Sequence, residues 1–333
     1  MTKFLISLML LVGMSLFFAA CQAPDAAPSQ AVKVASLSTE TSSPPSSSLA
    51  PQPRLDKDFN AYWYAGVAEL TGYKLTQSRY GELHEGEAAL IFVTEPFSAS
   101  KQVKLDYPRN SEDKVSVLKL NFTKKFLTGI YPYSLMTSVF TPIKSEKHPH
   151  TLKVSSTSQE WCGHTFMQFN REAKGYRASL YSYFESEGDE ETQFEDVMLE
   201  DEIWTRLRLD PKSLPLGKQD LMPSSMYLRL RHRPLRPMEA EMSLQAGELA
   251  GESLSVYRIY YPRDQRELKI YFQPDFPYVI EGWDESYQAP AWSGSSDKLT
   301  TQGRRLKTYR SPYWSQHDNQ HRALRAEMGL KVE

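Results

Sequence analysis

The sequence has few cysteines and almost no net charge. Two cysteines among 333 residues cannot form a disulfide framework, nor a zinc site built from four cysteines. Lysine and arginine together number 39, and aspartate and glutamate 41, which gives a formal charge of −2. Because nucleic-acid binding needs a strongly basic face or domain, this balance argues against a nucleic-acid partner.

Motifs that hold cofactors or nucleophiles are also missing. The sequence has no phosphate-binding loop, no glycine-rich dinucleotide fingerprint and no Gly-x-Ser-x-Gly elbow. His317 and His321 have the spacing of two zinc ligands on a helix, but Asp318 stands where a metallopeptidase needs glutamate, and no third ligand follows. We therefore expect no metal site and no cofactor.

The first twenty residues indicate a targeting signal. An apolar run at 4–20 follows a single cation, Lys3, and ends in Phe18-Ala19-Ala20-Cys21. Small residues before a cysteine resemble the lipobox of bacterial lipoproteins, where signal peptidase II cuts before the cysteine and the thiol carries diacylglycerol. We expect a lipoprotein signal peptide at 1–20 and lipidation at Cys21, although Phe18 replaces the usual leucine. The alternatives are a plain secretory signal or an uncleaved anchor.

A low-complexity segment follows the cysteine. Residues 22–53 contain eight serines, six prolines, six alanines and no aromatic residue. Such a composition buries too little apolar surface to fold, so 21–53, lipidated cysteine included, is predicted to be a disordered tether. In lipoproteins of this kind, aspartate after the cysteine causes retention in the inner membrane. Gln22 therefore favours an outer-membrane anchor through acyl chains, and the lack of an acidic run favours the periplasmic face.

All 19 tyrosines and six tryptophans lie in residues 54–333, which we predict to form one domain. Apolar and polar residues alternate there with the period of β-strands. The predicted strands are 62–72, 74–82, 87–95, 101–107, 114–122, 126–142, 150–157, 159–170, 175–185, 225–232, 238–246, 253–261, 266–273, 278–285 and 298–310. Short separations with almost no helical crossover require antiparallel pairing.

One segment has the period of a helix. Between 190 and 208, apolar residues recur at spacings of three, four and seven: Phe194, Val197, Met198, Ile203, Trp204 and Leu207. Acidic residues crowd its first half and Arg206 and Arg208 its end, as the helix dipole favours. The sequence therefore predicts a mainly β fold. We expect a large curled antiparallel sheet, like a clam or half-barrel, with one central amphipathic helix.

The segment Glu160-Trp161-Cys162-Gly163-His164 carries the most reactive groups. On a strand, Glu160, Cys162 and His164 would share one face, and a thiolate beside an imidazolium is a nucleophile. Side chains two apart on a strand diverge, however, so we favour a buried cysteine and a satisfied histidine. We assign no catalytic residue and expect no enzyme. A Cys/His-dependent hydrolase or transferase is the alternative.

Aromatic and basic residues give the candidates for binding. Trp63, Tyr131, Tyr133 and Trp283 belong to aromatic clusters that would contact an acyl chain or a sugar, and filling the core is the alternative. Arg229, Arg231 and Arg233 alternate along a predicted strand. An anionic ligand or a lipid head group is one interpretation of that row, and a solvent-facing ladder is the other.

Several short segments of the sequence together resemble those of a known family. They are Tyr62-Trp63-Tyr64-Ala65-Gly66, Arg79-Tyr80-Gly81-Glu82, Glu160-Trp161-Cys162-Gly163-His164, Asp210-Pro211-Lys212-Ser213-Leu214-Pro215 and Ile280-Glu281-Gly282-Trp283. From Tyr62 to Trp314 the chain resembles uncharacterised bacterial envelope lipoproteins that are often labelled septum formation inhibitor Maf. The expected sheet also resembles, more faintly, the clam-like sheets of envelope lipoprotein carriers.

The Maf label does not fit the residues. True Maf proteins are cytoplasmic nucleotide pyrophosphatases with a Ser-x-Ser-Pro-Arg-Arg stretch near the start, and Tyr309-Arg310-Ser311-Pro312 lacks the paired arginines. We expect instead a non-enzymatic binding or carrier module for a lipid, glycan or protein partner of the envelope. A structural component of an envelope complex is the alternative.

Overall fold

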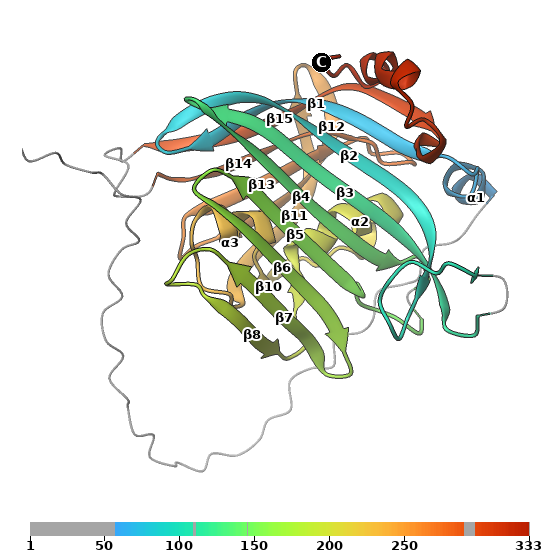
Figure 1. The fold of residues 1–333 in the computed structure, drawn as a ribbon, viewed down its shortest axis with the longest axis horizontal. Coiled ribbons are helices and arrows are strands. Elements are labelled where there is room, and N and C mark those ends of the chain that lie inside the picture. Colours follow the sequence, from blue (N-terminus) through green and yellow to red (C-terminus); the bar gives the residue numbers. More distant parts are fainter. Residues whose placement is uncertain (1–56, 109–110, 145, 290–296, 333) are drawn as a thin grey trace, which may run out of the picture. The chain divides into compact units, whose positions relative to one another are not determined.

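The structure, a computed structural model, describes residues 57–108, 111–144, 146–289 and 297–332. The predicted signal peptide at 1–20, the lipidation site Cys21 and the tether at 21–53 lie outside these residues. All described residues belong to one compact unit, most of which is a single sheet of 15 strands (Figure 1). The mainly β fold with a curled, unclosed sheet is therefore confirmed.

Eight strands come from the first part of the chain. They are β1 (Ala68–Arg79), β2 (Glu82–Ser98), β3 (Lys114–Thr128), β4 (Tyr131–Pro142), β5 (Lys153–Glu160), β6 (Gly163–Glu172), β7 (Gly175–Ser182) and β8 (Asp189–Phe194). Each strand pairs antiparallel with the next one along the chain.

The remaining strands form the other half of the sheet. They are β9 (Met198–Leu199), β10 (Gly217–Met222), β11 (Met238–Leu249), β12 (Glu252–Tyr261), β13 (Arg266–Phe272), β14 (Ile280–Gln288) and β15 (Lys298–Ser311). From β10 to β15 each strand again pairs antiparallel with the next, and β9 pairs parallel with β10. Pairing of β1 with β15 joins the two halves.

The turns between strands alternate between the two ends of the sheet. Successive antiparallel strands reverse direction, so the β1–β2, β3–β4, β5–β6 and β7–β8 turns lie at one end, on the left in Figure 1. We call this the hairpin end. The connection from β10 to β11 reaches the same end, whereas helix α1 (Lys57–Trp63) precedes β1 at the opposite end.

The sheet nearly closes on itself. Its two edge strands, β8 and β9, are separated along the chain by only three residues, Glu195, Asp196 and Val197. The four Cα steps from Phe194 to Met198 span at most about 14 Å. The two edges therefore approach each other at this point, and the sheet is curled without being closed.

Two helices lie against the inner face of the sheet. In α2 (Glu200–Leu209) every residue except Arg206 is buried, and all six residues of α3 (Ser225–Leu230) are buried. Small side chains let α2 approach the sheet closely, since the hydroxyl of Thr205 lies 2.6 Å from that of Thr141 on β4. The inner face is thus occupied by helix, and the main core surrounds α2 and α3.

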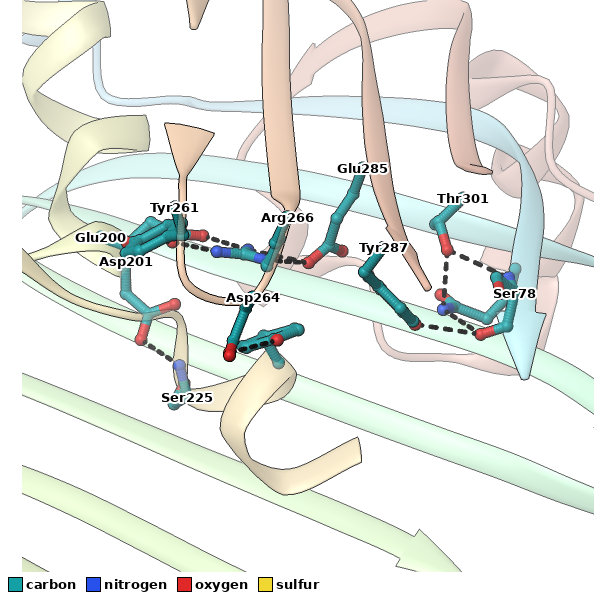
Figure 2. A network of polar contacts seen from close by, with 12 residues as sticks. Ser78, Glu200, Asp201, Ser225, Tyr261, Asp264, Arg266, Glu285, Tyr287 and Thr301 are labelled. Atoms are coloured by element: carbon teal, nitrogen blue, oxygen red, sulfur yellow. Dashed lines mark hydrogen bonds and ion pairs between the residues drawn. The ribbon is translucent and has the colours of Figure 1, made fainter. Parts of the chain in front are cut away.

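Charged groups are buried with these helices (Figure 2). Glu200 of α2 accepts two hydrogen bonds from Arg266 of β13, at 2.5 and 2.6 Å, and Glu285 of β14 accepts a third at 2.8 Å. Arg208, near the end of α2, donates to both oxygens of Glu69 on β1, at 2.5 and 2.6 Å. Because buried charges are stable only when paired, these contacts hold α2 between the two halves of the sheet.

Several predicted boundaries are wrong. Residues 190–199 are not helical: β8 and β9 occupy most of this range, and the helix begins only at Glu200. Pairing of β8 with β7 overrides the helix-like spacing there. The predicted strand at 225–232 is instead helix α3 and a turn. Its apolar residues are buried on all sides, and such a run does not distinguish a strand from a buried helix.

Smaller differences occur near the ends of the domain. The range 62–72 begins in α1 and becomes strand at Ala68, and 101–107 holds only an isolated bridge between Phe97 and Lys104. The tail is a 3₁₀ helix over Asn319–Met328. It crosses the outer face of β1 at Gly72, where an added Cβ would lie 2.2 Å from the carbonyl oxygen of Met328.

Candidate functional site: an arginine–tyrosine cluster

Polar and aromatic side chains from four hairpins and from α3 meet at the hairpin end, on the inner side of the sheet. We call this group the arginine–tyrosine cluster. Its members are Arg79, Tyr80, Tyr131, Tyr133, Glu160, Cys162, Phe184, Glu187, Arg229, Arg231 and His232. Inward-facing positions at the ends of β1, β4 and β5 supply the first part of it, and α3 with its following turn supplies the arginines nearest the centre.

A chain of hydroxyl groups runs across three hairpins. The hydroxyls of Tyr80 and Tyr133 lie 2.6 Å apart, and that of Tyr131 donates to Tyr80 at 3.0 Å. The thiol of Cys162 donates to Tyr131 at 3.7 Å, and the backbone N–H of Cys162 donates to Glu160 at 2.6 Å. Burial and the hydrogen bond to Tyr80 raise the pKa of Tyr131, so the Tyr131 hydroxyl stays protonated and can donate.

Arg79 is the cation at the centre of the tyrosines. Its guanidinium lies 4.3 Å from the ring centroid of Tyr80 and donates to the hydroxyl of Tyr133 at 3.2 and 3.3 Å. It also donates to the carbonyl oxygen of Leu230 at the end of α3. These acceptors are neutral, and no carboxylate among the described residues lies within ion-pair distance of Arg79.

A second group of charges lies beside α3. Arg229 forms an ion pair with Glu187 and lies over the ring of Phe184, 5.0 Å from its centroid. Nδ1 of His232 is 2.7 Å from Glu187 and 2.5 Å from Arg229, so its tautomer decides which of the two it bonds. Arg231 stacks on Tyr287, and its buried Nε has no hydrogen-bond partner within the described part of the chain.

The balance of these charges is positive. Burial and the nearby Arg229 and Arg79 lower the pKa of His232 to about 4, so the imidazole is neutral at pH 7. Burial and Arg79 likewise lower the pKa of Arg229 to about 10. Burial is the largest cause of both shifts, and repulsion from the neighbouring arginines adds to it against the opposing attraction of Glu160. An anion placed among the arginines would relieve this repulsion and gain charge-assisted hydrogen bonds.

The structure separates the residues of the predicted nucleophile. Glu160 and Gly163 pair across a hairpin, and Trp161 and Cys162 form its turn, so the strand alternation assumed for 160–164 is wrong. Glu160 and Cys162 belong to the cluster. His164 is exposed on β6 at a position that alternates with the inward-facing Gly163 and Thr165, so it faces away from the thiol.

The aromatic candidates divide into two groups. Tyr131 and Tyr133 belong to the cluster, whereas Trp63 and Trp283 lie in the core, each no more than 2% exposed. Trp283 packs against Phe122 and Trp204, with ring centroids 5.2 and 5.6 Å away. A ligand cannot reach either tryptophan without displacing the core.

Sequence reasoning missed Arg79, Tyr80 and His232. The turn Tyr80-Gly81 ends β1, and Tyr80 has a φ of +54°, a conformation that non-glycine residues adopt mainly in turns. His232 also has a positive φ, +48°, just after α3. An arginine and a tyrosine directly before a turn glycine form a pattern in the sequence that could have indicated the end of a strand.

A polar pocket of about 580 Å³ lies at the opposite end of the sheet. Its lining includes Gln102, His148, His150, Arg171 and Asp196. Arg171 and Asp196 form an ion pair at 2.5 Å, and the amide of Gln102 bonds the backbone of Arg171. None of the site residues predicted from the sequence lines it. Its walls carry both charge signs and no phenylalanine, tyrosine or tryptophan side chain.

No protein-family model matches the chain, and neither a search of curated proteins nor one of solved structures returns a match. Among the described residues, no three histidine, cysteine, aspartate or glutamate side chains are grouped to hold a metal ion. No helix in the described ranges is both long and apolar enough to span a membrane.

Proposed function

We propose that the chain is a lipid-anchored envelope protein whose β domain binds, without catalysis, a ligand that carries an anionic group. The binding site is the part of the arginine–tyrosine cluster around Arg79, with the Tyr80 and Tyr131 hydroxyls and Arg231 as its donors, and the Cys162 thiol lies outside this donor set. The observation that carries the proposal is Arg79, a largely buried cation whose hydrogen bonds all go to neutral oxygens. A buried charge without a counter-charge is costly, and a ligand anion would supply the missing partner.

The donors around Arg79 fit an oxyanion. The Tyr80 and Tyr131 hydroxyls and the Arg79 guanidinium lie within one hydrogen-bonded chain, and Arg231 adds a second cation nearby. Phosphate and carboxylate groups are bound in proteins by such arginine and hydroxyl donors. The rigid hairpins and α3 position them before the ligand arrives, which reduces the entropy cost of binding.

The geometry favours binding over covalent chemistry. The Cys162 thiol donates to the Tyr131 hydroxyl, a weak base, and the imidazole of His164, which the sequence offers as the base, lies on the outer face. A thiol nucleophile needs a base within hydrogen-bond reach. A Cys162→Ala protein is therefore expected to retain full ligand binding. Loss of binding on removal of the sulfur alone would instead support the Cys/His-dependent alternative.

The test of binding is native mass spectrometry of the full chain purified from membranes, followed by extraction of the bound molecule. We expect a reproducible co-purified anionic ligand, which is lost in Arg79→Gln and kept in Arg177→Gln, a matched change of an arginine on β7 whose side chain is 39% exposed. Urea unfolding of both variants establishes that each is folded. A protein that never carries a ligand would contradict the proposal and favour a structural role in an envelope complex.

The anchor is tested separately, because it rests on the sequence alone. Metabolic labelling with an alkyne fatty acid should mark the wild-type chain and leave Cys21→Ser unlabelled. Separation of inner from outer membranes then tests the outer-membrane location that Gln22 indicates. An unlabelled wild-type chain would overturn the lipoprotein assignment without affecting the binding site.

A further inference from the structure

Exposed apolar side chains gather at the hairpin end. Four of them lie at or next to turns, on different hairpins: Leu83 after the β1–β2 turn, Ile130 in β3–β4, Trp161 in β5–β6 and Tyr183 in β7–β8. Ile130, Trp161 and Tyr183 are 85, 70 and 74% exposed. Two further exposed side chains lie just behind the tips, Leu127 and Tyr181. We call these six residues the apolar rim.

The rim follows the order of the strands. The strands from β1 to β8 are neighbours in the sheet, so the four turns form one row, along the left side of Figure 1. Hairpins in a sheet repeat every two strands, about 10 Å, so the row of four tips is about 30 Å long. An extended row of leucine, isoleucine, tryptophan and tyrosine side chains fits a large flat surface better than a small ligand.

The rim and the arginine–tyrosine cluster are continuous. Trp161 stacks on Tyr131 with ring centroids 6.0 Å apart, and it immediately precedes Cys162. Tyr183 contacts Phe184 at 5.8 Å, and Phe184 in turn lies 4.9 Å from the ring of His232. Apolar side chains therefore face outward at the tips, while cations and hydroxyls lie directly behind them.

This arrangement matches one class of ligand. An apolar edge next to unpaired cations is complementary to an anionic amphiphile, whose head group and acyl chains need the two environments side by side. Tryptophan and tyrosine are also the residues that concentrate where water meets lipid. Three acidic residues, Glu185 in the β7–β8 loop and Asp189 and Glu190 at the start of β8, limit how deep that tip can enter such a surface.

We propose that the hairpin end docks on a bilayer that contains anionic phospholipid, with the head-group phosphate in the arginine–tyrosine cluster and the apolar rim at the acyl boundary. This inference rests on the proposed function and specifies its ligand. A weak affinity for the surface is sufficient, because a tether to the same membrane holds the domain at an effective concentration in the millimolar range.

The test uses the full lipidated chain reconstituted in vesicles. An environment-sensitive fluorophore is attached at Ile130→Cys in a Cys162→Ser background, and in a control at Tyr107→Cys, which is 89% exposed in the β2–β3 connection at the opposite end. Vesicles contain phosphatidylcholine alone or with phosphatidylglycerol. We expect a blue shift and quenching by nitroxide lipids at position 130, only in anionic vesicles, and neither change at 107.

Charge and rim variants sharpen the result. One arginine near an anionic surface changes partitioning about fivefold, so Arg79→Gln should lower the docked fraction by that factor and Arg177→Gln should not. Ile130→Asp places a charge at the tip and should abolish docking while leaving Arg79 and its hydroxyl partners in place.

Each other outcome overturns the inference in a recognisable way. Binding of inorganic phosphate or glycerol phosphate that depends on Arg79, with a silent label at 130, would keep the binding function and reject the lipid surface. A signal at 130 that rises with protein density and accompanies dimers would show that the rim joins two copies. A label that responds equally in neutral and anionic vesicles would reject the head-group assignment.

Discussion

Arg266→Met perturbs one of the most deeply buried charges in the described part of the fold. The guanidinium of Arg266 is 1% exposed and is shared between Glu200 on α2 and Glu285 on β14. Methionine keeps the packing of the aliphatic part of the arginine side chain but loses the contact of the guanidinium with the Tyr227 and Tyr261 rings. The variant therefore tests electrostatics more than volume.

The expected loss follows from what the substitution leaves behind. Breaking a buried ion pair by removing one partner costs about 3–5 kcal/mol, because the other charge stays buried without compensation. Here two carboxylates lose their arginine, and Lys124 is the neighbouring cation that still lowers the pKa of Glu285. We expect a loss of at least about 4 kcal/mol, a large part of the 5–15 kcal/mol that stabilises a typical domain.

Urea unfolding at equilibrium measures this loss. The midpoint should fall by at least about 1 M if the slope of the transition is near 3 kcal/mol/M. Lys218→Met is the matched control, because Lys218 and Glu241 form an exposed pair, which is worth less than about 1 kcal/mol. The neutral triple variant Glu200→Gln, Arg266→Met, Glu285→Gln should recover part of the stability. An Arg266→Met protein within about 1 kcal/mol of wild type would refute this account of α2.

Three further substitutions test other parts of the fold. Burial lowers the pKa of His232 to about 4, below the unfolded value near 6.5. The contribution of His232 to stability is therefore complete above pH 6.5 and is lost as the pH falls toward 4. In His232→Gln, urea midpoints measured across this pH range should no longer show that loss. Burial raises the pKa of Asp201 to about 6, above the unfolded value near 3.9. The contribution of Asp201 to stability is therefore complete below pH 3.9 and is lost as the pH rises through 6. Asp201→Asn should become more stable relative to wild type over that rise, and a stability difference between the two proteins that does not change with pH would contradict the assignment. Gly303→Ala places a Cβ 2.3 Å from the ring of Trp283 and should cost about 1–3 kcal/mol, so an unchanged melting temperature would contradict the packing.

The strands of the sheet were predicted more accurately from the sequence than the segments that depart from the strand pattern. Long alternating segments such as β12 and β13 were located to within two residues, because one face of each strand is buried and the period is unambiguous. The errors fell where tertiary contacts decide. Residues 225–230 alternate like a strand and become helix α3 inside the sheet, and 190–194 has helical spacing and becomes β8 through its pairing with β7.

The candidate site was only partly visible in the sequence. Tyr131, Tyr133 and Arg229 were identified as types of residue that bind ligands, but nothing in the sequence places four hairpins and α3 side by side. Arg79 and Leu230 are separated by 151 positions, and their contact depends on how the sheet curls around α3. Trp283, itself one of the binding candidates predicted from the sequence, fills the core instead.

The strand order has a consequence for how the chain folds. Every neighbouring pair in the sheet is consecutive along the chain except β1 with β15, and within the described residues only β9 and β10 pair parallel. Two meanders can therefore form from local contacts, which is the fast kind of folding, and one late step joins them. During synthesis the first strand is made long before its partner, the last strand. Until β15 arrives, β1 has one edge without a partner in the final sheet, and this edge is where a nascent chain would most need protection from aggregation.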